Sequence, residues 1–328
     1  MTFLYIVIAL VLIFDFINGF HDSANSIATV VSTKVLSPFS AVVLASVFNF
    51  VAFAVFPLKV ATTMGKGIIN PDVINLTVIA AALVAAITWN LLTWWWGLPS
   101  SSSHTLVGGL VGAAVSSSGI SSVIFAGLIK IIAFILIAPV LGTIISFIIS
   151  TVVVYLVRNR SPFGVDKHFR RLQLLSASAF SLGHGGNDAQ KSMGIIWVAL
   201  IVSGLATKND KIATWIVLSC QAAIALGTLF GGWRIVKTMG QKITKLKPFE
   251  GFCAETAGAL TLFGATHFGI PVSTTHTITG AIIGVGARKG ISSVKWGVTT
   301  KIFWAWILTI PVSAIIGGLM YYFLNWIL

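Results

Sequence analysis

An internal repeat is the feature of this sequence that most constrains its fold. Residues 99–105 read Pro-Ser-Ser-Ser-Ser-His-Thr, and residues 271–277 read Pro-Val-Ser-Thr-Thr-His-Thr. Residues 119–123 and 290–294 both read Gly-Ile-Ser-Ser-Val, so the two copies lie 171 or 172 residues apart. A long repeat within an apolar chain is typical of transporters whose substrate site lies between two related halves.

The composition places the chain in a membrane. Hydrophobic residues make up 56% of its 328 residues and charged residues only 9%, whereas ordinary proteins carry about 25% charged residues. Apolar stretches of spanning length recur from end to end, and the first, at residues 1–18, lacks the basic start of a signal peptide. The sequence therefore predicts an all-α polytopic membrane protein with about ten to twelve membrane segments.

The formal charge of +13 comes largely from two clusters. These clusters are Arg158, Arg160, Lys167, Arg170 and Arg171, and Arg234, Lys237, Lys242, Lys245 and Lys247. Loops rich in lysine and arginine stay in the cytoplasm, and no basic surface is carried on a soluble fold, so nucleic-acid binding is not expected. We expect a first membrane repeat at 1–157, a basic cytoplasmic loop at 158–171 and a second membrane repeat at 172–328.

The number of membrane crossings predicts that the two halves have opposite orientations. Five crossings in each half would invert the second half and place both termini outside the cytoplasm. Broken helices of the two halves would then meet at mid-membrane. The segment from Phe3 to Thr33 is expected to be broken, because glycines near the polar motifs would let helices unwind. These glycines are Gly19, Gly183, Gly185 and Gly186.

Pro99 and Pro271 are expected to interrupt two further membrane segments. We expect the helices to resume within a few residues, and whether these segments are re-entrant or full spans stays open. The expected restart positions are Ser103 or His104, and Thr275 or His276. Free N–H groups at such helix starts favour an anion, so these segments are candidate substrate-binding elements.

Acidic residues within apolar segments are candidate ion-binding groups, because an ionised carboxylate inside a bilayer needs a partner. Asp22 and Asp188 occupy equivalent positions in the two halves. Asn25 and Asn187 add neutral oxygen ligands of the kind that hard cations use. We expect these four residues to serve a coupling ion, and the two carboxylates would be the ligands if a metal cation binds. Simple helix-to-helix hydrogen bonding is the alternative.

Other polar residues in the apolar segments are less decisive. Glu255 is a further candidate for the coupling ion, whereas for Asp15, which has no acidic counterpart in the repeat, a packing role and a functional role are equally open. Cys220 and Cys253 lie in apolar runs and are expected to be buried and unpaired. Four histidines lie near the motifs, and hydrogen-bonded structural roles are expected, with pH sensing or metal binding as alternatives. They are His21, His104, His184 and His276.

A hydroxyl cluster follows each of the two prolines. Such side chains donate hydrogen bonds without adding charge, which suits an oxyanion that must be bound and then released. The candidate substrate ligands are Ser101, Ser102, Ser103, Thr105, Ser273, Thr274, Thr275 and Thr277. Two such clusters in register with two aspartate motifs are a stronger signal than one, because a single Ser near Pro commonly caps a helix.

The motifs together resemble those of a known transporter family. Residues 19–31 read Gly-Phe-His-Asp-Ser-Ala-Asn-Ser-Ile-Ala-Thr-Val-Val, and residues 184–196 read His-Gly-Gly-Asn-Asp-Ala-Gln-Lys-Ser-Met-Gly-Ile-Ile. With the two proline motifs, they resemble the signatures of the inorganic phosphate transporter (PiT) family, and within it the bacterial low-affinity branch. The resemblance covers nearly the whole chain. It implies phosphate uptake across the cell (inner) membrane by symport with a cation, with the protein as a homodimer.

Two departures from the sodium-coupled pattern bear on the coupling ion. Glu255-Thr256 matches a Glu-Thr motif that eukaryotic-type members carry in both halves, whereas the first half reads Phe48-Asn49-Phe50. Lys191 occupies the repeat position of Asn25, where its ammonium group would replace one bound sodium ion or contact the substrate. Two carboxylates and a phosphate dianion total about −4, which needs compensation in a low-dielectric site.

We therefore expect one or no sodium ions, and a proton as the favoured coupling ion. A metal–phosphate complex as substrate would also compensate the negative charge, because the metal ion would neutralise the phosphate. The alternatives are transport of another tetrahedral oxyanion such as sulfate, and, from other classes, a passive anion channel or an intramembrane enzyme. Symmetric pairs of polar residues argue against an enzyme, because a catalytic triad needs only one copy of each group.

Overall fold

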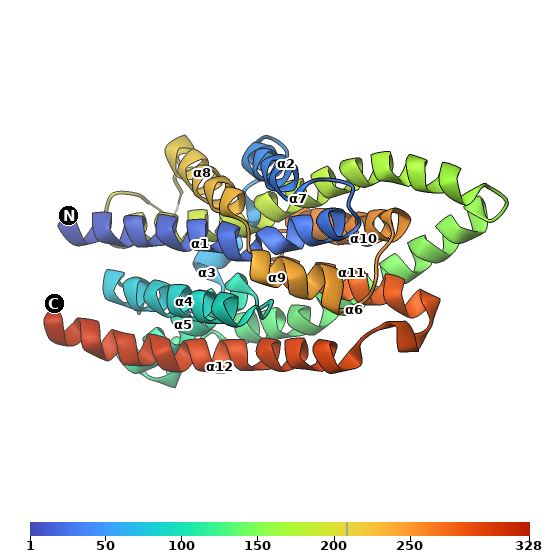
Figure 1. Ribbon diagram of the computed structural model, residues 1–328. Coiled ribbons are helices and arrows are strands. Elements are labelled where there is room, and N and C mark those ends of the chain that lie inside the picture. The colour runs from blue at the N-terminus through green and yellow to red at the C-terminus, as the bar shows by residue number, and fades with distance from the viewer. Residues whose placement is uncertain (208) are drawn as a thin grey trace.

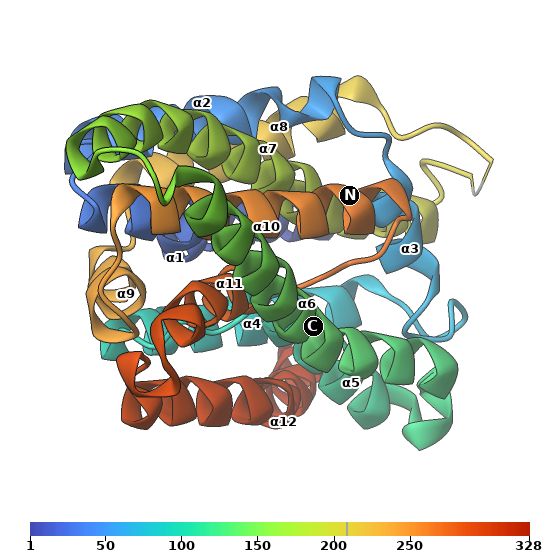
Figure 2. The same cartoon turned by 90° about the vertical axis from the view of Figure 1, so that its right-hand side faces the viewer.

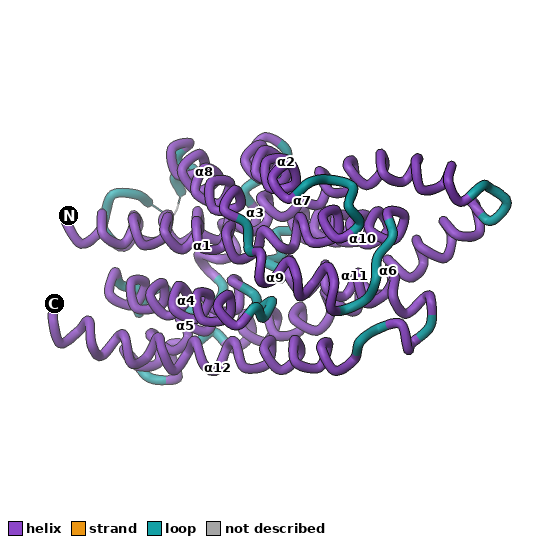
Figure 3. Tube along the Cα trace, viewed as in Figure 1, coloured by secondary structure: helices purple, strands orange, loops and turns teal. Residues whose placement is uncertain are grey.

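The computed structural model describes residues 1–207 and 209–328, and the side chains of all of these except 65 and 66. Within these ranges every regular element is a helix (Figure 3), and the only β contact is an isolated bridge between Ile69 and Val123. The prediction of an all-α fold is therefore confirmed for the described residues. The helices are α1 (Thr2–Ser32), α2 (Pro38–Val51), η1 (Ala52–Ala54), α3 (Lys59–Lys66), α4 (Leu76–Trp96), α5 (Ser102–Ser118), η2 (Ile120–Ser122), α6 (Phe125–Val157), α7 (Pro162–Val202), α8 (Thr214–Phe230), α9 (Trp233–Lys237), η3 (Thr238–Lys242), α10 (Pro248–His267), α11 (Thr274–Lys289), η4 (Ile291–Ser293) and α12 (Trp296–Ile327).

Several helices have the length and apolar surface of membrane spans. Among the described residues α1, α4, α6 and α12 are each long and apolar enough, and α8 with α9 and η3 makes a fifth candidate bent by 62°. The two longest of the four, α6 and α12, expose large apolar side chains, as expected for helices that face lipid. Examples are Leu136, Ile144, Leu156, Ile307, Ile315 and Leu319. The count of ten to twelve membrane segments stays a prediction.

The helices form two layers whose packing repeats itself. In Figures 1 and 2 one layer contains α1, α2, α7, α8 and α10, and the other contains α4, α5, α11 and α12. Helices of one half pack mainly on helices of the other: α5 on α12 and α11 on α6, α8 on α1 and α2 on α7. Both termini lie at one end of the molecule and the turn between α6 and α7 lies at the other (Figure 1).

Two helical hairpins bring the proline motifs toward the centre. The hairpin of α4 and α5 lies on the side of the termini, whereas α10 and α11 lie toward the α6–α7 turn (Figure 1). Gly97 and Gly269 follow the first helix of each hairpin with φ of 66° and 69°, a conformation that glycine adopts without strain. The second helices begin at Ser102 and Thr274, one residue earlier than the first of the predicted restart positions.

The prediction that glycines break the first segment of each half is wrong. Helix α1 is continuous over 31 residues and α7 over 41, and both pass through their polar motifs without interruption. The glycines allow close packing instead, because a Cβ on Gly19 would overlap the backbone of Ile224 in α8. A Cβ on Gly185 would likewise overlap the backbone of Asn49 in α2. Glycine at a helix contact and glycine at a helix break cannot be distinguished by composition alone.

The predicted basic loop is also shorter than expected. Helix α6 ends at Val157 and α7 begins at Pro162, so most of residues 158–171 are helical. Ser161 caps α7 by accepting a hydrogen bond from the backbone N–H of Gly164, and Pro162 occupies the first turn, where its missing N–H costs nothing. The basic residues therefore lie on a turn and on an extension of α7. The division of the chain into two repeats at this segment stays a proposal.

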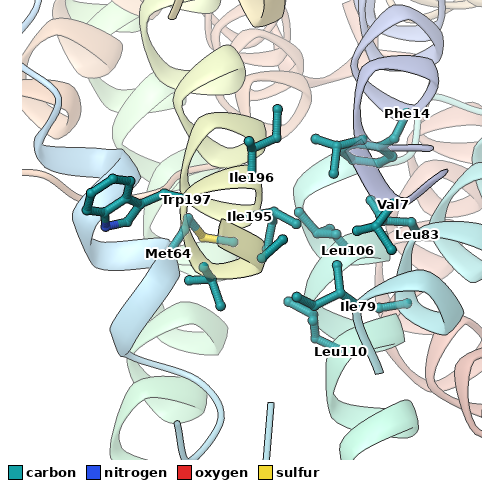
Figure 4. Packing of buried hydrophobic residues seen from close by; sticks show 14 of the residues in the cluster. Val7, Phe14, Met64, Ile79, Leu83, Leu106, Leu110, Ile195, Ile196 and Trp197 are labelled. Carbon is teal, nitrogen blue, oxygen red and sulfur yellow. The ribbon is translucent and has the colours of Figure 1, made fainter. Parts of the chain in front are cut away.

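Two hydrophobic clusters lie on either side of the polar motifs. One packs the first half of α1 against α3, α4, α5, α7 and α8, and Figure 4 shows part of it, with Phe14, Leu83 and Ile196 among its labelled residues. The other packs the end of α1 against α2, α10, α11 and α12. Cys220 and Cys253 are buried in these clusters and free, as predicted. The polar residues are thus enclosed between two apolar regions.

Glycines at i and i+4 let the hairpin helices pack closely on the two long helices. A Cβ on Gly280 of α11 would overlap the backbone of Pro139 in α6, and Gly284 meets Thr143 in the same way. The equivalent pair on α5, Gly108 and Gly112, meets α12. No hydrophobic driving force acts between helices inside a bilayer. This pattern of small residues four apart stabilises the helix contacts by close van der Waals packing instead.

Gly280→Ala is expected to lower the free energy of unfolding by about 1–3 kcal/mol, because the added methyl group forces two backbones apart. Thermal unfolding of the purified protein in detergent measures the effect. Gly264→Ala in α10 is the matched control, because its Cβ would meet no atom within 4 Å, and it is expected to leave stability unchanged or raise it by about 0.5–1 kcal/mol. Equal losses in the two variants would contradict the close-packing account.

Candidate functional site

The predicted coupling-ion residues of α1 and α7 meet in the interior of the protein. Asp22 and Asn25 on α1, and Asn187, Asp188 and Lys191 on α7, are each at most 2% exposed. Both helices pack on α11, and each also packs on the other. The start of α5 reaches the same region, since its Ser103 contacts Lys191. Four elements far apart in the sequence therefore bring their motifs to one place.

Lys191 is surrounded by oxygen atoms from three segments. Its ammonium group donates to Asp188 Oδ1 at 2.5 Å and to the backbone carbonyl of Val272 at 2.9 Å. It also donates to Ser103 Oγ at the start of α5. A carboxylate, a carbonyl and a hydroxyl are the ligand types that hard monovalent cations prefer. The ammonium group therefore occupies a position that suits a small cation, and it links the tips of both hairpins.

Asn25 and Thr274 join α1, α11 and α7. Asn25 Nδ2 donates to Thr275 Oγ1 at 3.0 Å and to Thr274 Oγ1 at 3.3 Å. Thr274 Oγ1 in turn donates to Asp188 Oδ2 at 3.0 Å. Asn187 is directed elsewhere, since its amide donates to Thr266 Oγ1 at 3.0 Å and to the carbonyl of Ile270. Asn187 therefore holds the end of α10 and the α10–α11 connection.

Asp22 is held by a chain of polar groups from the first hairpin. His21 Nδ1 donates to Asp22 Oδ1 at 2.6 Å, and His21 Nε2 is hydrogen-bonded to Thr93 Oγ1 at 3.1 Å. Ser100 Oγ donates to the same Thr93 hydroxyl at 2.8 Å. Sequence reasoning missed Thr93 and Ser100. A hydrogen-bonded structural role, the default expectation for His21, fits this geometry.

A carboxylate oxygen of Asp22, one of Asp188 and a ring nitrogen of His184 lie within 4.8 Å of one another. His184 Nε2 is 3.2 Å from Asp188 Oδ2, and His184 Nδ1 donates to Asn49 Oδ1 at 3.1 Å. The three groups are therefore spaced as ligands of one metal ion. Asp188 also carries the ion pair with Lys191, so a metal would share this carboxylate with an ammonium group.

The eight predicted hydroxyl ligands have different partners. Thr105 donates to the carbonyl of Ser102 and Thr277 to that of Ser273, so both are bound within the first turn of their own helix. Ser273 caps α11 by accepting from the N–H of His276. Ser102 Oγ is buried and has no hydrogen-bond partner among the described residues. The hydroxyls of Ser103, Thr274 and Thr275 are thus the ones that contact site residues, namely Lys191, Asp188 and Asn25, while Ser101 is buried at the start of α5.

Glu255 lies in a separate polar cluster. One of its oxygens accepts from Thr29 Oγ1 at 2.5 Å and from Gln173 Nε2 at 3.0 Å, and the other accepts from Ser176 Oγ at 2.5 Å. Thr29 is seven residues beyond Asp22 on α1, which places it about 10 Å along the helix axis. The three donors carry no recognisable motif, and sequence reasoning missed them.

Glu255 and Asn49, which were compared as the Glu-Thr motif of the second half and its replacement in the first, lie on different helices. Glu255 lies on α10, whereas Asn49 lies on α2 and donates to Thr228 Oγ1 of α8 at 2.8 Å. Helices α2 and α10 occupy different places in the order of elements within their halves. The two motifs therefore do not form a symmetric pair.

His104 and His276 meet each other where α5 and α11 approach. Their ring centroids are 4.7 Å apart, and His276 also stacks on Trp306 of α12 with centroids 3.7 Å apart. Trp306 Nε1 donates to the carbonyl of Pro99 at 2.9 Å. These histidines therefore pack α5, α11 and α12 together, but of the hydrogen bonds expected for them the described residues provide only that of His276 Nδ1 to the carbonyl of Ile135, at 3.4 Å, and His104 Nδ1 has no partner there.

The sequence and the fold are similar to those of known proteins. The chain matches the phosphate transporter family over residues 18–164 and again over residues 158–317. The chain belongs to this family. It is 57% identical over 315 residues to a protein of Rhizobium meliloti (strain 1021) named "Probable low-affinity inorganic phosphate transporter", with 96% of this chain and 94% of that protein covered.

Two further similarities support membership of the phosphate transporter family. A Bacillus subtilis (strain 168) protein of the same name is 45% identical over 329 residues, covering 100% of this chain and 98% of that protein. A solved structure described as "The sodium-dependent phosphate transporter" superposes with a TM-score of 0.89 and 28% identity, covering all of both chains. As a member of a family of transporters, this multi-pass membrane protein is not an enzyme, as the sequence predicted.

Proposed function

We propose that this member of the phosphate transporter family takes up inorganic phosphate by symport with protons. The single observation that carries this proposal is the position of Lys191. Its ammonium group lies among Asp188, Ser103 and the carbonyl of Val272, where a sodium ion would find suitable oxygen ligands. A fixed positive charge at this position removes the need for one bound sodium ion.

The charge balance of the site favours protons as the mobile coupling ion. Asp22, Asp188 and a phosphate dianion together carry about −4, and Lys191 cancels only one of these charges. Protons on the substrate or on a carboxylate would cancel more of them without requiring another cation cavity. Glu255 is a further carboxylate that could carry such a proton, because it is buried outside the main site and its hydrogen-bond donors are neutral.

We place phosphate at the starts of α5 and α11. Helix N-termini favour anions, the hydroxyls of Ser103, Thr274 and Thr275 contact the same group of residues, and the buried Ser102 hydroxyl has no hydrogen-bond partner among the described residues. The ammonium group of Lys191 adds a charge-assisted contact for the anion. Asp22 and Asp188 favour phosphate over sulfate, because a protonated phosphate can donate a hydrogen bond to a carboxylate and a fully ionised sulfate cannot.

A metal–phosphate complex is a second candidate substrate. It is favoured by one observation, the spacing of Asp22, His184 and Asp188, whose ligand atoms lie within 4.8 Å of one another. In that case the metal would neutralise the phosphate and leave with it, as cargo rather than as a resident ion. Uptake that needs a divalent cation in the assay buffer would support this alternative.

The architecture supports alternating access between two inverted repeats. The paired packing of α5 on α12 and α11 on α6, and the hairpins entering from opposite ends, are what a pseudo-two-fold axis in the membrane plane would produce. Because the basic residues near 158–171 lie opposite to the termini, the positive-inside rule places both termini outside the cytoplasm. We also propose the cell (inner) membrane as the location and a homodimer as the assembly, both from the family resemblance.

The proposal is tested by uptake of radiolabelled phosphate into proteoliposomes with either an inward proton gradient or an inward sodium gradient. We expect the proton gradient alone to drive accumulation, and excess unlabelled sulfate to leave it unchanged. Collapse of accumulation by a protonophore excludes a passive channel. Dependence on sodium at fixed pH would contradict proton coupling, and competition by sulfate would contradict the assignment of the substrate.

A further inference from the structure

Asp15 is a buried carboxylate that the proposed phosphate site does not use. It lies on α1, seven residues before Asp22, and its side chain is 0% exposed. Among the described residues neither of its two oxygens has a hydrogen-bond partner. An ionised carboxylate in such surroundings is unstable, so a buried group of this kind has to carry a proton or bind a cation.

The neighbours of Asp15 come from three helices. Asn18 of α1, Ser192 of α7 and Cys220 of α8 lie beside it. Asn18 Oδ1 and Ser192 Oγ are themselves buried without a hydrogen-bond partner among the described residues. Unpartnered polar atoms are rare in a protein interior, so the group around Asp15 has hydrogen-bonding capacity that packing of the helices does not use.

The charged groups that act on Asp15 belong to the main site. Asp188 and Lys191 of α7 are the two whose charges reach it. Helices α2 and α4, which also pack on α1, carry no titratable side chain, and α8 contributes only Cys220. Asp15 is therefore connected electrostatically to the ion pair at the centre of the protein.

The buried carboxylates occupy three levels along α1. Asp15 lies about 10 Å before Asp22, toward the N-terminus, at a rise of 1.5 Å per residue. Glu255 lies about the same distance beyond Asp22, because it is hydrogen-bonded to Thr29. With the termini outside the cytoplasm, Asp15 is on the outer side of the site and Glu255 on the inner side.

We propose that Asp15 is the outer proton acceptor of the transporter, which takes the coupling proton from the extracytoplasmic side and delivers it toward Asp188. This inference rests on the proposed proton symport and extends it by naming the residue at which the proton enters. Ser192, which follows Lys191 on α7 and neighbours Asp15, is the hydroxyl that we place on the path of this transfer.

A proton suits Asp15 better than a sodium ion. Sodium requires several oxygen ligands, whereas one side of Asp15 is lined by the thiol of Cys220, a soft and poor ligand for a hard cation. The surroundings beyond these polar neighbours are apolar, since Val11 and Phe14 of the same turn belong to a hydrophobic cluster. A protonated carboxyl is neutral and tolerates such surroundings.

The test compares two modes of transport by Asp15→Asn in proteoliposomes. Net uptake driven by a proton gradient requires proton entry, whereas exchange of internal for external labelled phosphate involves no net proton movement. We expect net uptake by Asp15→Asn to fall to the level of protein-free liposomes, while phosphate exchange continues at the wild-type rate. Asp15→Glu, which keeps a carboxyl group, is expected to retain proton-driven uptake. The matched control is Asp72→Asn, because Asp72 is exposed on the segment before α4.

Wild-type net uptake by Asp15→Asn would overturn the proposal. Loss of exchange together with net uptake would also overturn it, because Asp15 would then be needed for the fold or for phosphate binding. A third outcome is that a sodium gradient drives uptake by the wild type but not by Asp15→Asn. Asp15 would then be a sodium ligand, which would contradict the proton assignment. Failure of the proposed function is distinguishable, because then the wild-type protein itself would not respond to a proton gradient.

Discussion

Replacing Lys191 by asparagine is expected to abolish proton-driven phosphate uptake and to make any remaining uptake dependent on sodium. The substitution removes the ammonium group from between Asp188 Oδ1, the carbonyl of Val272 and Ser103 Oγ. These oxygens then lack a cation, and the new side chain adds an amide oxygen like that of Asn25 at the equivalent repeat position. A sodium ion is the small hard cation that such a set of oxygens binds.

Two measurements check this result. Uptake into proteoliposomes is compared with imposed proton and sodium gradients, and thermal unfolding in detergent is followed with and without sodium chloride, using choline chloride as the ionic control. Sodium is expected to raise the unfolding temperature of Lys191→Asn and not that of the wild type, because a ligand stabilises the state that binds it. Lys301→Asn is the matched control, since Lys301 is exposed on α12. Unchanged proton-driven uptake by Lys191→Asn would show that the ammonium group has no part in coupling.

Replacing Asp188 by asparagine is expected to lower the free energy of unfolding by about 3–5 kcal/mol, because it leaves the buried ammonium group of Lys191 without its carboxylate. Lys191 is 2% exposed and its remaining partners, Ser103 and Val272, are neutral. Adding Lys191→Met to the same protein removes the unpaired charge, so most of the lost stability is expected to return. Phosphate uptake is expected to be absent from the single and the double variant.

Unfolding of wild type, Asp188→Asn, Lys191→Met and the double variant in detergent forms a double-mutant cycle. The control is Asp166→Asn, which breaks the exposed ion pair between Asp166 and Arg170, 2.8 Å apart and almost half exposed. That pair is expected to contribute less than about 1 kcal/mol. Additive losses in the double variant, with no recovery, would show that Asp188 and Lys191 stabilise the protein independently of each other.

The repeat indicated which polar residues meet in the interior, while their roles stay a proposal. Asp22, Asn25, Asp188 and Lys191 lie in motifs that occur twice, and the proposed inverted repeat would bring both copies of such motifs to its axis. Local sequence also predicted the interruptions at Pro99 and Pro271, because proline and glycine interrupt helices through chemistry that a sequence displays directly, but it left open whether these segments form hairpins.

Contacts between helices could not be predicted in this way. Gly19 and Gly185 have the composition of a helix break, but each lies where another helix backbone passes, and only the packed structure shows that neighbour. The pairs Gly108 and Gly112, and Gly280 and Gly284, were readable as a packing motif in the sequence. The spacing does not show which long helix each pair contacts: α5 packs on α12, and α11 packs on α6.

The partners of Glu255 were beyond sequence reasoning for the same reason. Thr29 lies on α1, whereas Gln173 and Ser176 are neighbours on one face of α7, and nothing in the sequence indicates that the two helices share an acceptor on α10. The hydroxyl clusters show a different limit: a motif that is visible in the sequence does not determine the partners of its side chains. Thr105 and Thr277 match the substrate motif in sequence, but their hydroxyls are hydrogen-bonded within their own helices, as threonines often are in a first turn.

The central claim is that Lys191 takes the place of a coupling sodium ion. The most direct test is a double-label experiment, in which proteoliposomes with an inward proton gradient receive labelled phosphate and labelled sodium together, and both are counted inside. The account predicts that phosphate accumulates while sodium enters no faster than it does without phosphate. Entry of sodium in fixed proportion to phosphate, or failure of phosphate to accumulate when sodium is omitted, would contradict it.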